Sequence, residues 1–142
     1  MLLSRFLKKP LILKNNHDFN KYMVSNIHSK GINFSQELLG IKGEDILFGL
    51  NGDDKIYSSF RNDILYGGLE KNKLFEGKGK DRLFGKGDSD ILSAREESDD
   101  LYGGGGSDKL FGGRGKDKLY GGGGSDKLFG GGGKDKLYGG GG

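Results

Sequence analysis

Aspartate recurs every nine residues along most of this chain of 142 residues. The residues in this register are Asp45, Asp54, Asp63, Asp81, Asp90, Asp99, Asp108, Asp117, Asp126 and Asp135, with Asn72 as the one replacement. Glycines precede most of these aspartates, and the register contains no cysteine or histidine. Carboxylates and backbone carbonyls without nitrogen or sulfur ligands favour a hard cation. The chemistry to expect is therefore ligation of such a cation by oxygen.

Other chemistries find little support in the sequence. The chain has no cysteine, and its two histidines, His17 and His28, have no catalytic or metal-binding partner at a characteristic spacing. A glycine run before Asp135 resembles a phosphate-binding loop, but aspartate stands where that loop needs Ser or Thr for magnesium. We therefore expect no enzymatic activity. The 23 basic and 20 acidic residues are interspersed, so we expect no nucleic-acid partner.

A nine-residue repeat positions the aspartates. The frame holds from residue 40 to residue 138 without an insertion or deletion. Its eighth position is always Leu or Ile, and its ninth is Phe or Tyr in every unit except the one that ends in Ser93. A degenerate unit at residues 31–39 places Gln36 in the aspartate position. A disordered glycine tract has no reason to keep this phase, so the repeat predicts a regular structure.

Each unit divides into six turn-forming residues and three strand-forming residues. Glycine permits the tight turn, while the aliphatic residue of the short strand points inward and its two neighbours point outward. A second period of eighteen residues is also present, because Ser107 and Ser125 alternate with Lys116 and Lys134. Two units in each coil explain both periods. The sequence therefore predicts an all-β fold, a parallel β-roll (a right-handed β-helix or solenoid) of about six coils.

Stacked coils bring like charges together. Asp108 should lie over Asp126, and Asp117 over Asp135, about 5 Å apart. Such pairs repel by roughly 1 kcal/mol in water and by more in a protein. Two thin columns of Leu and Ile bury too little apolar surface to offset the entropy of ordering so many glycines. A divalent cation between coils converts this repulsion into ligation, and a flexible site made only of oxygens suits calcium better than zinc or magnesium.

The repeat resembles the RTX, or haemolysin-type, calcium-binding nonapeptide Gly-Gly-x-Gly-x-Asp-x-U-x, in which U is a large aliphatic residue. Every specified position is matched by the units GGGGSDKLF (103–111), GGRGKDKLY (112–120), GGGGSDKLF (121–129) and GGGGKDKLY (130–138). The resemblance covers about three-quarters of the chain. It implies a parallel β-roll with calcium between turns two units apart. It also implies a domain that stays unfolded until it is exported and meets extracellular calcium.

Transferred to this sequence, the resemblance implies calcium between Asp108 and Asp126 and between Asp117 and Asp135, with Asp90 and Asp108 as a third pair. Backbone carbonyls are expected to assist from the turns around Gly104, Gly106, Gly113, Gly115, Gly122, Gly124, Gly131 and Gly133. Further candidate ligands are Asp45, Asp54, Asp81 and Asp99. The turns at residues 58–63 and 94–99 lack glycine, and residues 67–72 end in asparagine. We expect sites that use these three turns to be weak or empty.

The chain departs from the acidic pattern of the family through its lysines. The seventh position is lysine at Lys109, Lys118, Lys127 and Lys136, and each of these is followed two places later by Phe or Tyr. Stacked lysines repel cations, so we expect weaker calcium binding than in acidic relatives. One alternative function is an adhesive or surface-layer module that binds an anionic polysaccharide or a membrane through a Lys/aromatic face. Another alternative is a degenerate remnant that binds no calcium.

The organisation of the chain follows from the frame. Residues 1–30 lie outside it and are expected to form an N-terminal cap or a disordered segment. Asp18 can cap a short helix that carries Phe19, Tyr22, Met23, Val24 and Ile27. Residues 31–142 form the predicted RTX-like β-roll, which is degenerate over 31–102, near-consensus over 103–138, and ends in a truncated unit at 139–142.

The resemblance also implies a cellular context. RTX-like repeats point to a secreted or cell-surface protein that a type I secretion apparatus exports, as part of a toxin, protease, lipase or adhesin. A cleavable signal peptide is not expected, because Arg5, Lys8, Lys9 and Pro10 interrupt the apolar N-terminal stretch. No segment reaches the eighteen or so uncharged apolar residues that a membrane-spanning helix needs.

Overall fold

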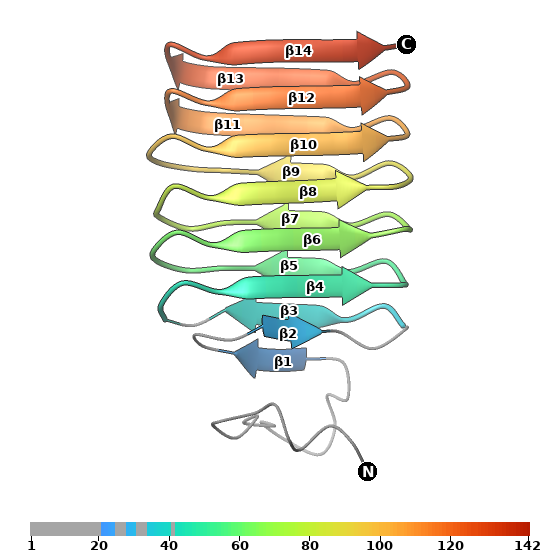
Figure 1. The fold of residues 1–142 in the computed structure, drawn as a ribbon, viewed down its shortest axis with the longest axis vertical. Coiled ribbons are helices and arrows are strands. Elements are labelled where there is room, and N and C mark those ends of the chain that lie inside the picture. Colours follow the sequence, from blue (N-terminus) through green and yellow to red (C-terminus); the bar gives the residue numbers. More distant parts are fainter. Residues whose placement is uncertain (1–20, 25–27, 31–33, 41) are drawn as a thin grey trace.

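The computed structural model describes residues 21–24, 28–30, 34–40 and 42–142. Within these residues the chain forms a stack of flat coils, and each coil contributes one strand to each of two sheets (Figure 1). No helix in the described part of the chain is long and apolar enough to cross a membrane. The all-β, parallel solenoid predicted from the repeat is confirmed.

In the described residues both sheets are parallel and contain seven strands. Consecutive strands of the chain belong to alternate sheets, so neighbours in a sheet are every second strand. Sheet A consists of β1 (Lys21–Val24), β3 (Glu37–Gly40), β5 (Lys55–Tyr57), β7 (Lys73–Phe75), β9 (Ile91–Ser93), β11 (Lys109–Gly115) and β13 (Lys127–Gly133). Sheet B consists of β2 (His28–Lys30), β4 (Ile46–Leu50), β6 (Ile64–Gly68), β8 (Arg82–Lys86), β10 (Asp100–Gly105), β12 (Lys118–Gly123) and β14 (Lys136–Gly141). Leu110 pairs with Leu128 and Leu119 with Leu137, which confirms two nonapeptides per coil.

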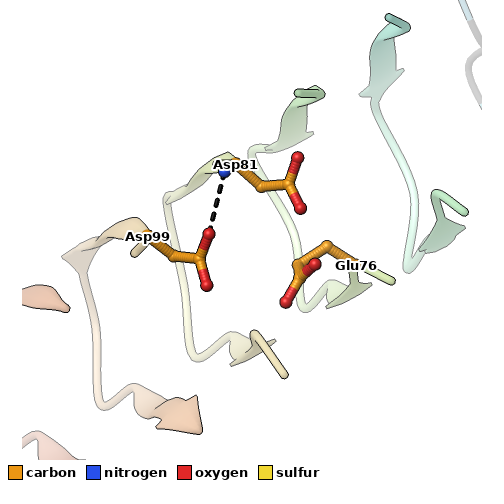
Figure 2. A group of neighbouring side chains, drawn as sticks. All are labelled: Glu76, Asp81 and Asp99. Carbon is orange, nitrogen blue, oxygen red and sulfur yellow. Dashed lines mark hydrogen bonds between the residues drawn. The ribbon is translucent and has the colours of Figure 1, made fainter. Parts of the chain in front are cut away.

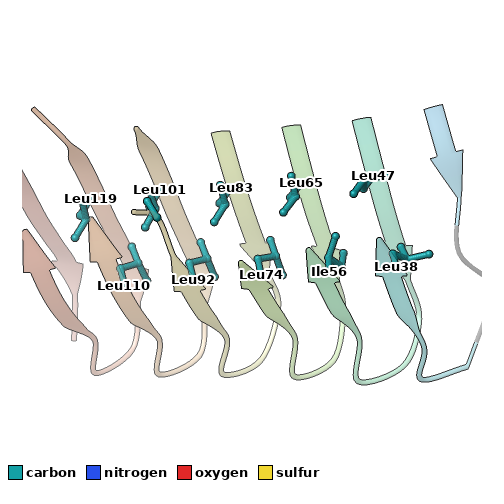
Figure 3. Close-up of a cluster of buried hydrophobic side chains, with 11 residues drawn as sticks. Leu38, Leu47, Ile56, Leu65, Leu74, Leu83, Leu92, Leu101, Leu110 and Leu119 are labelled. Carbon is teal, nitrogen blue, oxygen red and sulfur yellow. The ribbon is translucent and has the colours of Figure 1, made fainter. Parts of the chain in front are cut away.

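The core is two columns of aliphatic side chains, one from each sheet (Figure 3). Sheet A supplies Leu38, Ile56, Leu74, Leu92 and Leu110, and sheet B supplies Leu47, Leu65, Leu83, Leu101 and Leu119, all of them fully buried. Their neighbours on each strand are less buried, in the alternation that a strand with one inner face requires. The core is only two side chains wide. Much of the buried interior is therefore formed by residues of the turns at either edge.

Strand length differs from the prediction in the near-consensus coils. Three-residue strands occur at β5, β7 and β9, but β10 to β14 contain six or seven residues. The extra residues are turn glycines that stay paired, such as Gly113 with Gly131 and Gly115 with Gly133. Glycine carries no side chain that blocks the close approach of the next coil, so the ladder continues into the turn.

The N-terminal helix is contradicted where the structure describes this segment. Lys21–Val24 is strand β1, paired with β3, and His28–Lys30 is strand β2, paired with β4. Tyr22, Met23 and Val24 are residues that also suit strands, and pairing with an existing sheet edge outweighs the weak tendency of a short segment to form a helix. Asp18, Phe19 and Ile27, the other residues of that prediction, lie outside the described residues.

Candidate metal centre

The recurring aspartates form two columns inside the roll, one at each edge. The turns that lead from sheet A to sheet B hold the first column, which consists of Asp45, Asp63, Asp81, Asp99, Asp117 and Asp135. The turns that lead from sheet B to sheet A hold the second column, which consists of Gln36, Asp54, Asn72, Asp90, Asp108 and Asp126. The aspartates from Asp45 to Asp117 are at most 1% exposed, and Asp126 and Asp135 in the last coil are partly buried.

In every aspartate of the two columns from Asp54 to Asp135, one carboxylate oxygen is held by the preceding coil. The backbone N–H of Asp90 donates to Oδ1 of Asp108 at 2.8 Å, and the N–H of Asp108 donates to Oδ1 of Asp126 at 2.9 Å. The same bond joins Asp99 to Asp117 at 3.0 Å in the other column. These hydrogen bonds aim each side chain inward and tie consecutive coils together. The nine-residue spacing gave no sign of them, because they exist only once coils are stacked.

In eight of these aspartates the second carboxylate oxygen has no hydrogen-bond donor. Buried Oδ2 atoms without a partner belong to Asp54, Asp63, Asp81, Asp90, Asp99, Asp108, Asp117 and Asp126. The first glycine of the turn makes room for this atom. A Cβ on Gly103 would lie 2.4 Å from Oδ2 of Asp108 and 2.6 Å from the carbonyl oxygen of Gly121 in the next coil. Two oxygen acceptors therefore face the same space, and burying them together is costly unless a proton or a cation lies between them.

Burial perturbs the acidity of these side chains. Burial raises the pKa of Asp90 and Asp99 from 3.8 to about 7, and that of Asp54 and Asp63 to about 6. The pKa of Asp108 is also raised, first by burial and then by repulsion from Asp126. The metal-free columns thus resist carrying charge. An all-oxygen, anionic donor set of this kind fits calcium.

Gln36 and Asn72, two members of the second column, carry a neutral amide in place of the carboxylate. Gln36 donates from Nε2 to the carbonyl oxygen of Gly49 at 3.0 Å, which is the carbonyl equivalent to that of Gly121 at Asp108. The Nδ2 group of Asn72 donates to the carbonyl oxygen of Glu70 in its own turn. An amide hydrogen there removes the need for an ion, so the expectation of a weak or empty site at Asn72 stays a prediction with a physical basis.

The turns without glycine keep the shape of the others. Arg61 and Glu97 adopt positive φ values of 85° and 76° in the fourth position, where the near-consensus turns have Gly106 and Gly115. Asp63 and Asp99 consequently lie inside the roll like the other aspartates. Asp63 belongs to the register but was not among the expected ligands, and its unpartnered Oδ2 places it with them. How strongly these turns bind an ion stays a prediction.

The glycines expected to supply carbonyl ligands all lie at the contact between coils. Positive φ values occur at Gly104, Gly106, Gly113, Gly115, Gly122, Gly124, Gly131 and Gly133. A Cβ on Gly122 would lie 2.0 Å from the carbonyl oxygen of Gly104, and one on Gly124 would lie 1.7 Å from that of Gly106. Glycine suits these positions best, because the carbonyl of one coil lies against the α-carbon of the next. Their role as calcium ligands remains a prediction.

One turn carries an additional buried carboxylate that the sequence reasoning missed. Glu76 stands in the first position of its turn, where Gly103 and Gly112 stand in theirs, and its side chain lies close to Asp81 and Asp99 (Figure 2). The backbone N–H of Arg95 donates to Oε1 of Glu76. Burial, followed by the interaction with Asp81, raises the pKa of Glu76 strongly. The signal was the substitution of glutamate for a consensus glycine.

The lysines and aromatic side chains lie on two opposite outer faces. Lys109 and Lys127 belong to sheet A, whereas Lys118 and Lys136 belong to sheet B. Sheet B carries a continuous ladder of stacked rings with centroids 4.7–4.8 Å apart, formed by Phe48, Tyr66, Phe84, Tyr102, Tyr120 and Tyr138. The ladder on sheet A is interrupted at Ser93. The Lys and aromatic side chains of successive units are therefore divided between two surfaces.

Comparison with known proteins gives one match. The family model described as RTX calcium-binding nonapeptide repeat (4 copies) matches residues 39–74, 77–110 and 111–142, which together make up well over half of the chain. These segments include the turns of both aspartate columns from Asp45 onward. Neither a curated protein nor a solved structure matches the chain.

Proposed function

The chain belongs to the RTX calcium-binding nonapeptide repeat family, and we propose that calcium ions held along the two aspartate columns drive its folding. The observation that carries this proposal is the row of buried Oδ2 atoms without a donor. Several of them share their space with a backbone carbonyl of the next coil, as Asp90 does with Gly103 and Asp108 with Gly121. The repeat is a structural calcium-binding unit, and the proposal assigns it no catalytic step.

The energetics support a metal-dependent fold. The core consists of two aliphatic columns, and the interior also contains stacked carboxylates that repel one another. Removing this repulsion by ligation makes the free energy of calcium binding available for folding. Calcium supplies the positive charge and flexible oxygen coordination when bound. Each aspartate orients one oxygen toward the ion. The hydrogen bonds from the backbone N–H groups of the preceding coil keep that orientation.

The cellular role follows from this coupling. Sites with dissociation constants near 10⁻⁴–10⁻³ M, the range of extracellular modules, stay empty in the cytosol and fill outside the cell. A chain of this kind leaves the cell unfolded, through a type I secretion apparatus, and folds on arrival. We accordingly place the mature domain outside the cell or at its surface, as part of a larger secreted protein.

The proposal is tested by far-ultraviolet circular dichroism of the full chain during a calcium titration from zero to 10 mM. We expect a cooperative gain of β-sheet signal with calcium and none with magnesium, whose short, octahedral coordination does not suit the site. The matched control replaces Asp90, Asp108 and Asp126 by Asn, which retains the Oδ1 acceptor and removes the charge. A spectrum that stays disordered, or one that is equally β-rich without calcium, contradicts the proposal.

A second candidate function has support from the outer face of sheet B. Its ladder of six stacked rings is flanked by Arg82, Lys118 and Lys136, a combination that suits an anionic polysaccharide. Retention of the calcium-loaded chain on heparin resin tests it. Replacing Lys118 and Lys136 by Ser should reduce retention more than replacing Lys109 and Lys127 on sheet A. Equal retention of both variants and the wild type rejects this function.

A further inference from the structure

Glu76 differs from every other residue in its position of the repeat. The first position of the turn is glycine in most units, and it is Ser58 and Ala94 in the neighbouring turns of the same edge. Glutamate is far larger than these residues, yet Glu76 is only 2% exposed. Its side chain points into the roll toward Asp81 of its own turn and Asp99 of the next coil (Figure 2). A third carboxylate thus enters a space that elsewhere holds two.

We infer that Glu76, Asp81 and Asp99 form a calcium site of a second kind, built from three side-chain carboxylates. The inference rests on the proposed function, because it takes calcium as the ion that the roll binds. One oxygen from each residue lies within 4.8 Å of the other two. Calcium binds oxygen at 2.3–2.6 Å, so ligands on opposite sides of one ion are about 4.6–5.2 Å apart. These separations are of the size that the ligands of one ion span, so small movements of the side chains bring all three carboxylates into contact with a single ion.

The hydrogen bonds leave one oxygen of each residue for an ion. Oε1 of Glu76 accepts the N–H of Arg95, Oδ1 of Asp81 accepts the N–H of Asp63, and Oδ1 of Asp99 accepts the N–H of Asp81. As carboxylates, the three side chains have no donor at Oε2 of Glu76 or at Oδ2 of Asp81 and Asp99, and all three atoms are buried. Metal ligands are typically arranged in this way, with one oxygen free for the ion and the other fixed by a hydrogen bond.

Within the described part of the chain, no basic side chain forms an ion pair with any of these three residues. The ion pairs in that part of the chain join Lys78 to Glu96 and Lys118 to Asp100. The donor set is anionic and contains only oxygen, which selects calcium over zinc. The three charges exceed the two that the other aspartate pairs supply. We therefore expect this site to bind calcium at least about tenfold more tightly than they do, since ligand charge tunes affinity.

An entry path lies beside the site. A surface groove of about 550 Å³ crosses the same edge of the roll, and its lining includes Phe60, Glu76, Gly77, Lys78 and Arg95. Glu76 therefore borders both the groove and the buried carboxylates. The groove offers an ion a route toward the carboxylates from this side of the roll.

Isothermal titration calorimetry of the full chain with calcium chloride tests the inference. The wild type should show one ion bound at least about tenfold more tightly than the rest. Glu76→Gln keeps the size of the side chain and an acceptor for Arg95, but removes the charge. Glu76→Gly restores the residue that the family places there. Glu96→Gln is the matched control, because it removes a charge from the exposed side of the neighbouring turn.

Loss of the tight step in both Glu76 variants, with the weaker steps retained and Glu96→Gln unchanged, supports the site. Circular dichroism in saturating calcium verifies that each variant folds. A tight step that survives Glu76→Gln overturns the inference, and so does a wild-type isotherm with only equivalent weak sites, while both leave the proposed function intact. A wild type that binds only the tight ion supports the site and overturns calcium binding along the columns. No calcium binding at all overturns both.

Discussion

Adding one methyl group to the first glycine of a turn should close a calcium site. In Gly103→Ala the new Cβ would lie 2.4 Å from Oδ2 of Asp108 and 2.6 Å from the carbonyl oxygen of Gly121, whereas ordinary contact begins near 3.4 Å. Gly103 has no positive φ, so the effect comes from this collision and not from backbone strain. The carboxylate or the next coil must move, which removes the geometry that an ion requires.

The expected cost follows from packing. Inserting a methyl group into a filled interior costs about 1–3 kcal/mol, and Gly103 is buried with two oxygens inside contact distance. We expect the free energy of unfolding in saturating calcium to fall by about 2 kcal/mol. With a denaturant slope of about 2 kcal/mol per molar urea, the unfolding midpoint falls by about 1 M. Urea titration followed by circular dichroism measures this shift.

Gly123→Ala is the matched control. Gly123 lies in the same edge of the roll, is exposed, and has no heavy atom within 4 Å of an added Cβ. Its substitution should leave stability unchanged or raise it by up to about 1 kcal/mol, since alanine restricts the unfolded chain. If Gly103→Ala and Gly123→Ala unfold at the same urea concentration, the space beside Asp108 is not the filled interior described above, and the reasoning is refuted.

Three other predictions concern charge, strain and an amide. Because burial raises the pKa of Asp90 and Asp99 from 3.8 to about 7, the metal-free roll is most stable below about pH 4 and loses that stability as pH rises through 7. Calcium affinity should instead fall on acidification. The β-sheet circular dichroism signal at pH 4–8 should therefore decrease with rising pH without calcium and increase with rising pH at a limiting calcium concentration. Arg61→Gly should stabilise the roll by about 1 kcal/mol, because glycine adopts the positive φ of this position without strain. Arg114 has no positive φ, so Arg114→Gly should destabilise the roll by about 0.5–1 kcal/mol. Urea midpoints that shift in the same direction in both variants would contradict this reasoning. Asn72→Asp should add one bound calcium ion in calorimetry, and an unchanged ion count would argue against the role given to its amide.

Periodicity was sufficient to predict the scaffold. The eighteen-residue repeat predicted Asp108 over Asp126 and Asp117 over Asp135, and both stackings are present. An inward aliphatic residue and a parallel ladder follow from local strand geometry, which the sequence pattern carries directly.

Features that depend on contacts between coils were not visible in the pattern. The bond from each aspartate N–H to the carboxylate of the next coil links residues eighteen apart, and no local rule requires it. The helix predicted near Tyr22 failed because sheet pairing prevailed over a weak local tendency. Glu76 was overlooked because departures from a consensus were counted as decay, although a buried carboxylate is a chemical addition.

The most direct test of the aspartate columns is a long-wavelength anomalous diffraction map from crystals of the full chain grown with calcium. We predict calcium peaks between successive coils, within about 2.6 Å of the Oδ2 atoms of Asp90, Asp108 and Asp117. The same roll without peaks beside these oxygens would contradict the account, because the buried carboxylates would then be stabilised by something other than calcium.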